Sequence, residues 1–226
     1  SVGIAAVSEI VGTAVEYVKT KGGLPFIVPA MGSQGGATSE GQRAVLRGYG
    51  IDEPSMQCPV VYSMEVIPLD SISTPRVYLS RDAYEADGII VINRVKPHTD
   101  FHGPVESGLM KMLVIGLGKH AHALEMHRYG VPGLREGIPV AARRVLETGK
   151  ILMGIGIVEN AYDKVLRVQA CRGREIPETD AALLALARES MASLPFDALD
   201  LLVVDWIGKD ISGTGMDTNV IGRVRI

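Results

Sequence analysis

Apolar residues follow two different spacings along the chain, one typical of helices and one typical of buried strands. From Ser8 to Gly23 and from Glu178 to Leu194, apolar side chains recur three or four residues apart, which predicts amphipathic helices. Short continuous apolar runs, such as "GIIVINRV" at residues 88–95, predict strands that are covered on both faces. Alternating helices and buried strands predict an α/β fold.

Further runs extend this prediction to the whole chain. Residues 150–160 and 164–171 predict a hairpin, and "LDLLVVDWIG" at residues 199–208 predicts another buried strand. We expect two α/β domains with mostly parallel sheets and an active-site cleft between them. Residues 1–176 form the first domain, and residues 177–226 begin a second domain that is truncated. The chain starts at Ser1 and stops in the strand-like pattern "GRVRI", so we expect a segment of a longer protein, with its N-terminal start also missing.

Composition and charge narrow the possible partners. The 226 residues are 46% hydrophobic and 22% charged, and acids and bases are interspersed to a formal net charge of −3. Because no basic stripe stands out and aromatic residues are scarce, a nucleic-acid partner is not expected. No apolar run is long enough to cross a membrane. Cys58 and Cys171 lie far apart in no metal-binding spacing, which indicates reduced thiols in a cytoplasmic protein.

Three glycine-rich polar loops follow predicted strands, at residues 31–38, 96–107 and 208–219. In open α/β sheets, ligands bind at the carboxyl ends of the strands, so these loops are where we expect a site. The first loop, "MGSQGGAT", stands before a predicted helix, and its backbone N–H groups suit an anion. A simple strand-to-helix turn explains the same residues equally well.

All five histidines fall between residues 98 and 127. His98 directly follows a predicted strand, where catalytic groups of α/β enzymes often lie, although an exposed loop histidine fits as well. His120 and His127 share a helix face, and His120 and His122 both suit a surface helix. His127 lies one turn before Gly130, a predicted helix end, where the helix dipole favours a cation.

Two lysines stand in unusual places. Lys111 interrupts the apolar run "GLMKMLVIGLG", so its amine either reaches outward to water or is desolvated and used, for instance in a covalent attachment. Lys209 opens a polar loop after a predicted strand. Asp205, Asp210 and Asp217 surround Lys209, but they lack the regular spacing of a calcium site.

Common nucleotide-binding motifs are missing from the sequence. "GIGIVEN" is not the dinucleotide fingerprint and opens a predicted hairpin, and "GLGKHAH" lacks the spacing and the hydroxyl residue of a P-loop. We therefore expect neither a Rossmann dinucleotide enzyme nor a P-loop ATPase.

Several segments together resemble the lactate racemase family that uses a nickel-pincer nucleotide, and most closely its broad branch of homologues with unassigned substrates. The segments occur in the family's order and span nearly the whole chain. They are "PAMGSQGGAT", "VINRVKPHTDFHGPVESGLMKMLVIGLGK", "EMHRYG", "ENAYD" and "DWIGKDISGTGMDTNVIGR".

This resemblance implies roles for four residues. Lys111 matches the lysine that tethers the cofactor through a thioamide, and His127 matches the nickel ligand. His98 matches one of two acid/base histidines, and Lys209 matches a lysine of the second domain that contacts the substrate. The implied activity is racemisation or epimerisation of a 2-hydroxy acid by proton-coupled hydride transfer. The implied partners are this acid and the proteins that make the cofactor.

The sequence departs from the family's pattern at two positions. Gln34 stands where the family has its second acid/base histidine, and an amide does not exchange protons near neutral pH. Val2 stands where the family has an arginine for the substrate carboxylate. His102, four residues after His98, is a hypothetical replacement for the second base.

Two other classes of function stay open. One is a different divalent-metal enzyme, in which His98, His102 and nearby acids hold zinc or a similar ion. The other is a non-catalytic ligand-binding member of the family, which keeps the fold without the second base.

Overall fold

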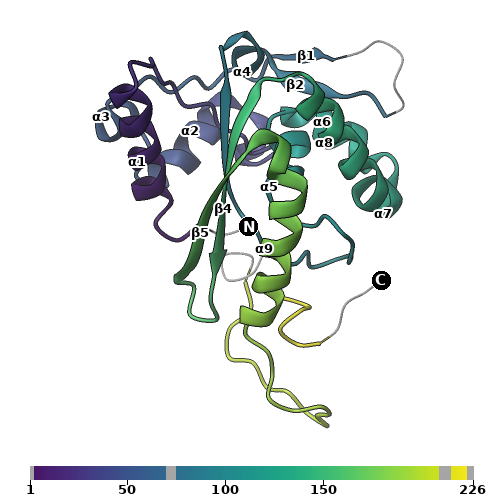
Figure 1. Ribbon diagram of the computed structural model, residues 1–226. Coiled ribbons are helices and arrows are strands. Elements are labelled where there is room, and N and C mark those ends of the chain that lie inside the picture. The colour runs from purple at the N-terminus through teal and green to yellow at the C-terminus, as the bar shows by residue number, and fades with distance from the viewer. Residues whose placement is uncertain (1–2, 70–74, 209–214, 223–226) are drawn as a thin grey trace.

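The computed structural model describes residues 3–69, 75–208 and 215–222, and it has an α/β fold, as the apolar spacing predicts (Figure 1). Its strands are β1 (Val66–Pro68), β2 (Tyr78–Ser80), β3 (Ile89–Arg94), β4 (Ile151–Glu159) and β5 (Val165–Arg172). Its α-helices are α1 (Val7–Thr20), α2 (Ser39–Gly48), α3 (Glu53–Met56), α4 (Arg81–Glu85), α5 (Leu109–Lys111), α6 (Lys119–His127), α7 (Gly130–Pro132), α8 (Ile138–Glu147) and α9 (Ile176–Ser190). Short 3₁₀ turns are η1 (Gly35–Ala37) and η4 (Gly173–Glu175), and π-helical turns are η2 (Met112–Gly116) and η3 (Gly133–Gly137).

The central sheet has the strand order β3-β4-β5. β3 pairs in parallel with β4, and β4 pairs in antiparallel with β5. The predicted hairpin is therefore confirmed, and it makes the sheet mixed because its second strand returns directly beside the first. A separate antiparallel pair joins β1 to β2.

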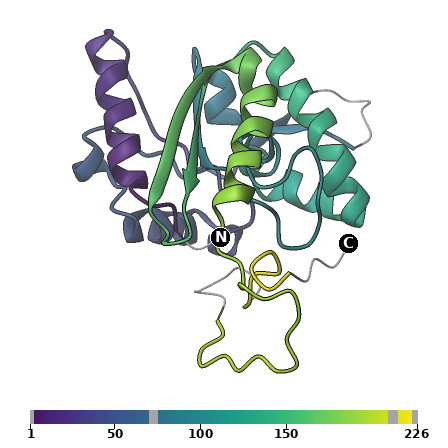
Figure 2. The ribbon, with the colours of Figure 1, turned by 60° about the horizontal axis from the view of Figure 1, so that its bottom comes forward.

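Helices cover the two faces of the central sheet unequally. Helix α9 packs closely on one face, because Gly156 of β4 has no side chain to hold it away. A Cβ at this position would lie 2.3 Å from a methyl group of Leu183. Helix α1 lies over the other face and leaves more space (Figures 1 and 2). The glycines of "GIGIVEN" thus serve helix packing rather than nucleotide binding.

The largest core cluster lies between the sheet and the helices that follow Lys111. Leu113, Val114, Met126, Ile138 and Ala142 are fully buried in it. Burying such side chains is the main favourable term for folding. The helix that carries Lys111 is therefore anchored in the largest buried cluster of the described residues.

The strand predicted at residues 199–208 is wrong. Residues 201–204 and 206–208 have no regular secondary structure, and the side chains of Leu201 and Trp206 are 78% and 70% exposed. A strand needs the backbone of a neighbouring strand, and none of the described strands pairs with this segment. The boundary between residues 176 and 177, and with it the two-domain arrangement, stays a prediction.

Candidate functional site

His98 lies on the loop that leaves the carboxyl end of β3. Lys96 and Ser107 close this loop by two backbone hydrogen bonds of 2.7 and 3.2 Å. The imidazole lies against the ring of the buried Phe101, with 4.4 Å between the ring centroids. Its Nδ1 accepts a hydrogen bond of 3.1 Å from the backbone N–H of Asp100. The neutral ring therefore carries its proton on Nε2, which is the nitrogen left to meet a ligand.

The electrostatic surroundings of His98 bring together residues that are distant in sequence. Burial, followed by the electrostatic effects of Lys111, Lys96 and His127, lowers the pKa of His98 to about 3. Asp217 acts in the opposite direction. The imidazole is therefore neutral at physiological pH, and Lys111 and His127, to which the resemblance assigns roles, are among the residues that act on it.

Lys111 ends the short helix α5, directly before the π-helical turn η2. The start of this helix is held by Asp180 of α9, whose buried carboxylate accepts hydrogen bonds from the N–H groups of Leu109 and Met110, at 2.7 and 3.2 Å. Burial lowers the pKa of Lys111 to about 8, with Asp100 acting in the opposite direction. A substantial fraction of this amine is therefore neutral near pH 8, which is the nucleophilic form.

The glycine-rich loop packs against the helical turn that follows Lys111. A Cβ at Gly116 would lie 2.7 Å from the carbonyl oxygen of Ala30, so glycine is what allows this approach. Gln42 of α2 holds the loop from its other side by a 3.2 Å hydrogen bond from Nε2 to the carbonyl oxygen of Gly32. Gln34 itself is exposed at the beginning of η1.

His127 lies at the end of α6 and is exposed. Its Nδ1 is 2.6 Å from the carbonyl oxygen of Ala123, one turn earlier. Because a carbonyl only accepts, Nδ1 must carry the proton, which leaves the Nε2 lone pair free. A metal-bound histidine usually has this arrangement, in which a backbone carbonyl fixes the ring through the other nitrogen.

The remaining sequence candidates have different outcomes. His102 is half exposed, and its Nδ1 lies 3.2 Å from a carboxylate oxygen of Glu106. Lys209, Asp210 and Val2 lie outside the described residues. In the described part of the chain, no group of three or more His, Cys, Asp or Glu side chains is arranged to hold a metal ion. A zinc site built from His98, His102 and nearby acids therefore finds no support there.

Sequence reasoning missed several buried polar residues around the site. Lys119 is fully buried, and its Nζ donates to the carbonyl oxygen of Pro29 at 2.5 Å, just before the glycine-rich loop. Burial lowers the pKa of Lys119 to about 8. His122, expected on the surface, is also fully buried, with Nδ1 3.2 Å from the carbonyl oxygen of Tyr78. The sequence around His122, which follows "GLGK", did not indicate that this side chain is buried.

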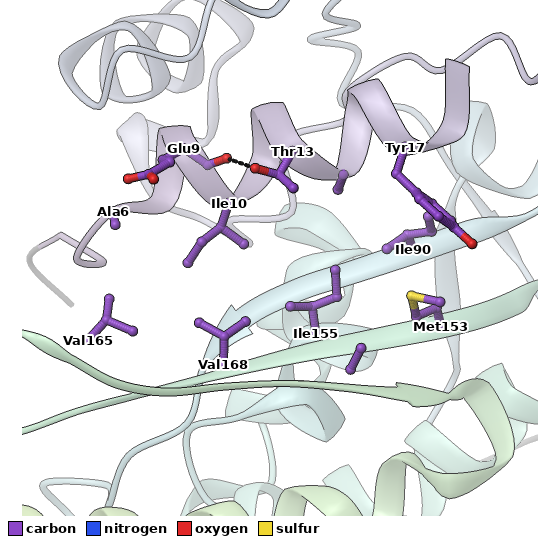
Figure 3. A pocket seen from close by; sticks show the side chains of 12 residues that line it. Ala6, Glu9, Ile10, Thr13, Tyr17, Ile90, Met153, Ile155, Val165 and Val168 are labelled. Atoms are coloured by element: carbon purple, nitrogen blue, oxygen red, sulfur yellow. Dashed lines mark hydrogen bonds between the residues drawn. The ribbon is translucent and has the colours of Figure 1, made fainter. Parts of the chain in front are cut away.

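A cavity of about 650 Å³ lies elsewhere, between α1 and the sheet (Figure 3). Its walls are mostly apolar, with Ile10 of α1 opposite Ile155 and Val168 of the sheet. The polar groups that line it are Glu9, Thr13 and Tyr17. Among the residues that the structure describes, none of the predicted site residues lines this cavity, so it is distinct from the described part of the candidate site.

None of the described helices has the length and apolar character needed to cross a membrane.

Among curated proteins, none matches the chain. Among solved structures, the lactate racemase apoprotein from Thermoanaerobacterium thermosaccharolyticum is similar, with a TM-score of 0.44 and 12% identity over 74% of this chain and 49% of that one. The chain thus spans about half the length of that protein. The profile of the family described as "Domain of unknown function (DUF362)" matches residues 4–207, and the chain therefore belongs to this family.

Proposed function

We propose that this chain carries a nickel-pincer nucleotide on Lys111 and acts as a racemase or epimerase of a 2-hydroxy acid. One observation carries the proposal. Lys111 and His127, which are 13 and 29 residues further along the chain, both lie within electrostatic range of the imidazole of His98. This electrostatic coupling supports the proposal that the residues assigned to cofactor attachment, nickel binding and proton transfer act at one site.

The side chains fit such a cofactor in two respects. Lys111 offers an amine whose pKa is lowered to about 8, which suits a covalent attachment. His127 offers a free Nε2 lone pair on a ring that Ala123 holds in place. Since one imidazole is a small part of a metal's coordination, the other donors would come from the cofactor. When bound, the cofactor would supply the acceptor for a hydride from C2 of the acid and return that hydride to either face.

His98 is the residue proposed to handle the hydroxyl proton. In its resting state Nε2 holds a proton, so the ring donates a hydrogen bond to an oxygen of the substrate. To accept the hydroxyl proton on Nε2, the ring must carry its own proton on Nδ1 instead, and the N–H of Asp100 must then release Nδ1. The backbone at Asp100 is therefore part of the acid/base chemistry.

Gln34 limits proton transfer on the face of the substrate opposite to His98. Its amide can hold a substrate oxygen by a hydrogen bond but cannot take up a proton near neutral pH. Racemisation requires proton exchange on both faces, so we expect slow conversion unless His102 or solvent serves the second face. A family member that binds the acid without converting it is the second candidate function, and the exposed Gln34 is the observation that favours it.

Chiral chromatography of a panel of 2-hydroxy acids tests the proposal. The protein is first co-expressed with the cofactor-making enzymes and shown to contain nickel. We expect slow conversion by the wild type, faster conversion by Gln34→His, and a loss of about a hundredfold or more in His98→Ala. If Gln34→His, loaded with nickel, interconverts none of the acids, the racemase proposal is wrong. Binding of an acid without turnover would point to the second candidate.

The proposal extends to partners and location. A protein that carries this cofactor must meet the proteins that make it, and we propose that both are cytoplasmic. The acid is expected to approach from solvent towards the free Nε2 of His98. Lys209 is proposed to contact the same acid.

A further inference from the structure

The backbone of His98 is held at its N–H and at its carbonyl group by side chains to which the resemblance assigns no role. Its N–H donates to Oε2 of Glu106 at 2.6 Å, and its carbonyl oxygen accepts from Nδ2 of Asn219 at 3.0 Å. We infer that Glu106 and Asn219 are positioning residues for His98, which fix its backbone so that only Nε2 of its ring is left for a ligand.

Glu106 is built into the fold as an anchor for the whole loop. Its side chain is fully buried, although an isolated buried carboxylate would be very costly. Oε1 accepts a 3.0 Å hydrogen bond from the N–H of Gly103, while Arg188 of α9 lies 2.5 Å from the same oxygen. The ring of His102 lies 3.2 Å away. These donors compensate for the burial and tie the loop to α9.

The second support comes from the far end of the described chain. Asn219 lies 121 residues after His98, and its neighbours make further contacts with the same loop. The hydroxyl of Thr218 donates to the carbonyl oxygen of Thr99 at 2.5 Å, and Asp217 lies 3.6 Å from the amine of Lys96. Residues 217–219 therefore contact the loop at three residues rather than through a single side chain.

The contacts that hold the backbone of His98 also determine the orientation and the tautomer of its imidazole. Phe101 fixes the plane of the imidazole, and the N–H of Asp100 occupies Nδ1. Both residues belong to the short segment that Glu106 and Asn219 hold in place. Because each of these contacts depends on the loop's conformation, releasing either support should let the ring turn and sample both tautomers. The catalytic meaning of this inference rests on the proposed function, whereas its structural content does not.

Nitrogen-15 NMR of the histidine side chains tests the inference in the whole chain, without cofactor and at neutral pH. The resonances of His98 are identified by their loss in His98→Gln. In the wild type we expect a single tautomer with the proton on Nε2. In Asn219→Ala we expect resonances shifted towards a mixture of the two tautomers. Asn219→Asp keeps the size but removes the donor, and it should behave like Asn219→Ala.

Matched variants separate positioning from general destabilisation. Glu106→Gln keeps an acceptor without the charge, and it should shift the His98 resonances in the same direction. Glu147→Ala removes a carboxylate from an exposed pair with Arg144, and it should leave them unchanged. Thermal unfolding shows which variants are folded, and if Glu106→Gln is not, the two Asn219 variants decide alone.

Wild-type resonances of His98 in the folded Asn219 variants would overturn the inference. So would a wild-type ring with its proton on Nδ1. The two proposals fail separately. If the protein shows the expected tautomer but never acquires nickel, only the proposed function is contradicted. If the protein acquires nickel but its His98 resonances are the same in the Glu106 and Asn219 variants as in the wild type, only this inference is contradicted.

Discussion

Two loops carry the positions that the resemblance assigns to proton transfer, and the fold holds them in different ways. In the loop of residues 96–107, a buried carboxylate and a distant asparagine hold the backbone on both sides of His98. In the glycine-rich loop of residues 31–38, Lys119 and Gln42 hold backbone carbonyls near one end, and Gln34 is exposed. The first loop fixes the orientation of its imidazole, whereas the second loop fixes only its backbone and supports the packing of the helix after Lys111.

Substituting Glu106 in the first loop's support and Gln42 in the second loop's support should show this difference most strongly. Glu106→Ala leaves the half-exposed Arg188 and two backbone N–H groups without their carboxylate partner, so we expect the free energy of unfolding to fall by about 2–4 kcal/mol. Gln42 makes one hydrogen bond to Gly32, and its buried Oε1 has no partner in the described structure. Gln42→Met should therefore cost less than about 1 kcal/mol. Urea unfolding measures both, and equal losses would contradict the comparison.

Two neighbouring glycines test how tightly the backbone of the glycine-rich loop is fixed. Gly35 and Gly36 both have φ of +66°, but a Cβ at Gly35 would lie 2.5 Å from the carbonyl carbon of Gly41, while nothing lies within 4 Å of one at Gly36. Gly36→Ala should cost about 1 kcal/mol for the left-handed backbone alone. Gly35→Ala should cost about 3 kcal/mol because the clash adds to it. If the two variants are equally stable, the loop does not pack against α2 as described.

The pH dependence of stability tests the anchor at Lys119. Burial lowers the pKa of this amine to about 8, so between pH 8 and 10 the unfolded chain binds more protons than the folded one. The contribution of Lys119 to the free energy of unfolding should therefore rise with pH, by about 2 kcal/mol over this range. Lys119→Met lacks this contribution. The difference between wild type and variant, measured by urea unfolding at each pH, isolates Lys119 from the similarly shifted Lys111, and a constant difference would contradict the burial of a titrating amine.

Most of the fold follows from the spacing of apolar residues. The helices of residues 7–20 and 176–190, the strand β3 and the β4–β5 hairpin were all predictable, because apolar residues recur along each element. The strand expected at residues 199–208 was not formed. An apolar run shows that burial is favourable, but whether a partner strand lies beside it depends on residues elsewhere.

The site was predictable only where a residue type is unusual for its position. Lys111 interrupts an apolar run and His98 follows a strand, so both gave a signal. Glu106 and Asp180 gave none, since a carboxylate in a polar loop or on a helix normally faces water, and their burial depends on partners 70 or more residues away. His122 was assigned to the wrong environment. The π-helical turn η2 interrupts the regular 3.6-residue repeat before α6, so the repeat does not show which face of α6 is buried.

Peptide mapping by mass spectrometry, combined with metal analysis, tests the central claim most directly. After co-expression with the cofactor-making enzymes, we predict an adduct on the peptide with Lys111 and nickel in the protein. Lys119 serves as an internal control, because its pKa is equally lowered to about 8 but its amine is fully buried. Lys111→Arg should lack both adduct and nickel, and His127→Ala should keep the adduct with less nickel. Absence of both from the wild type, or an adduct on Lys119 instead, would contradict the account.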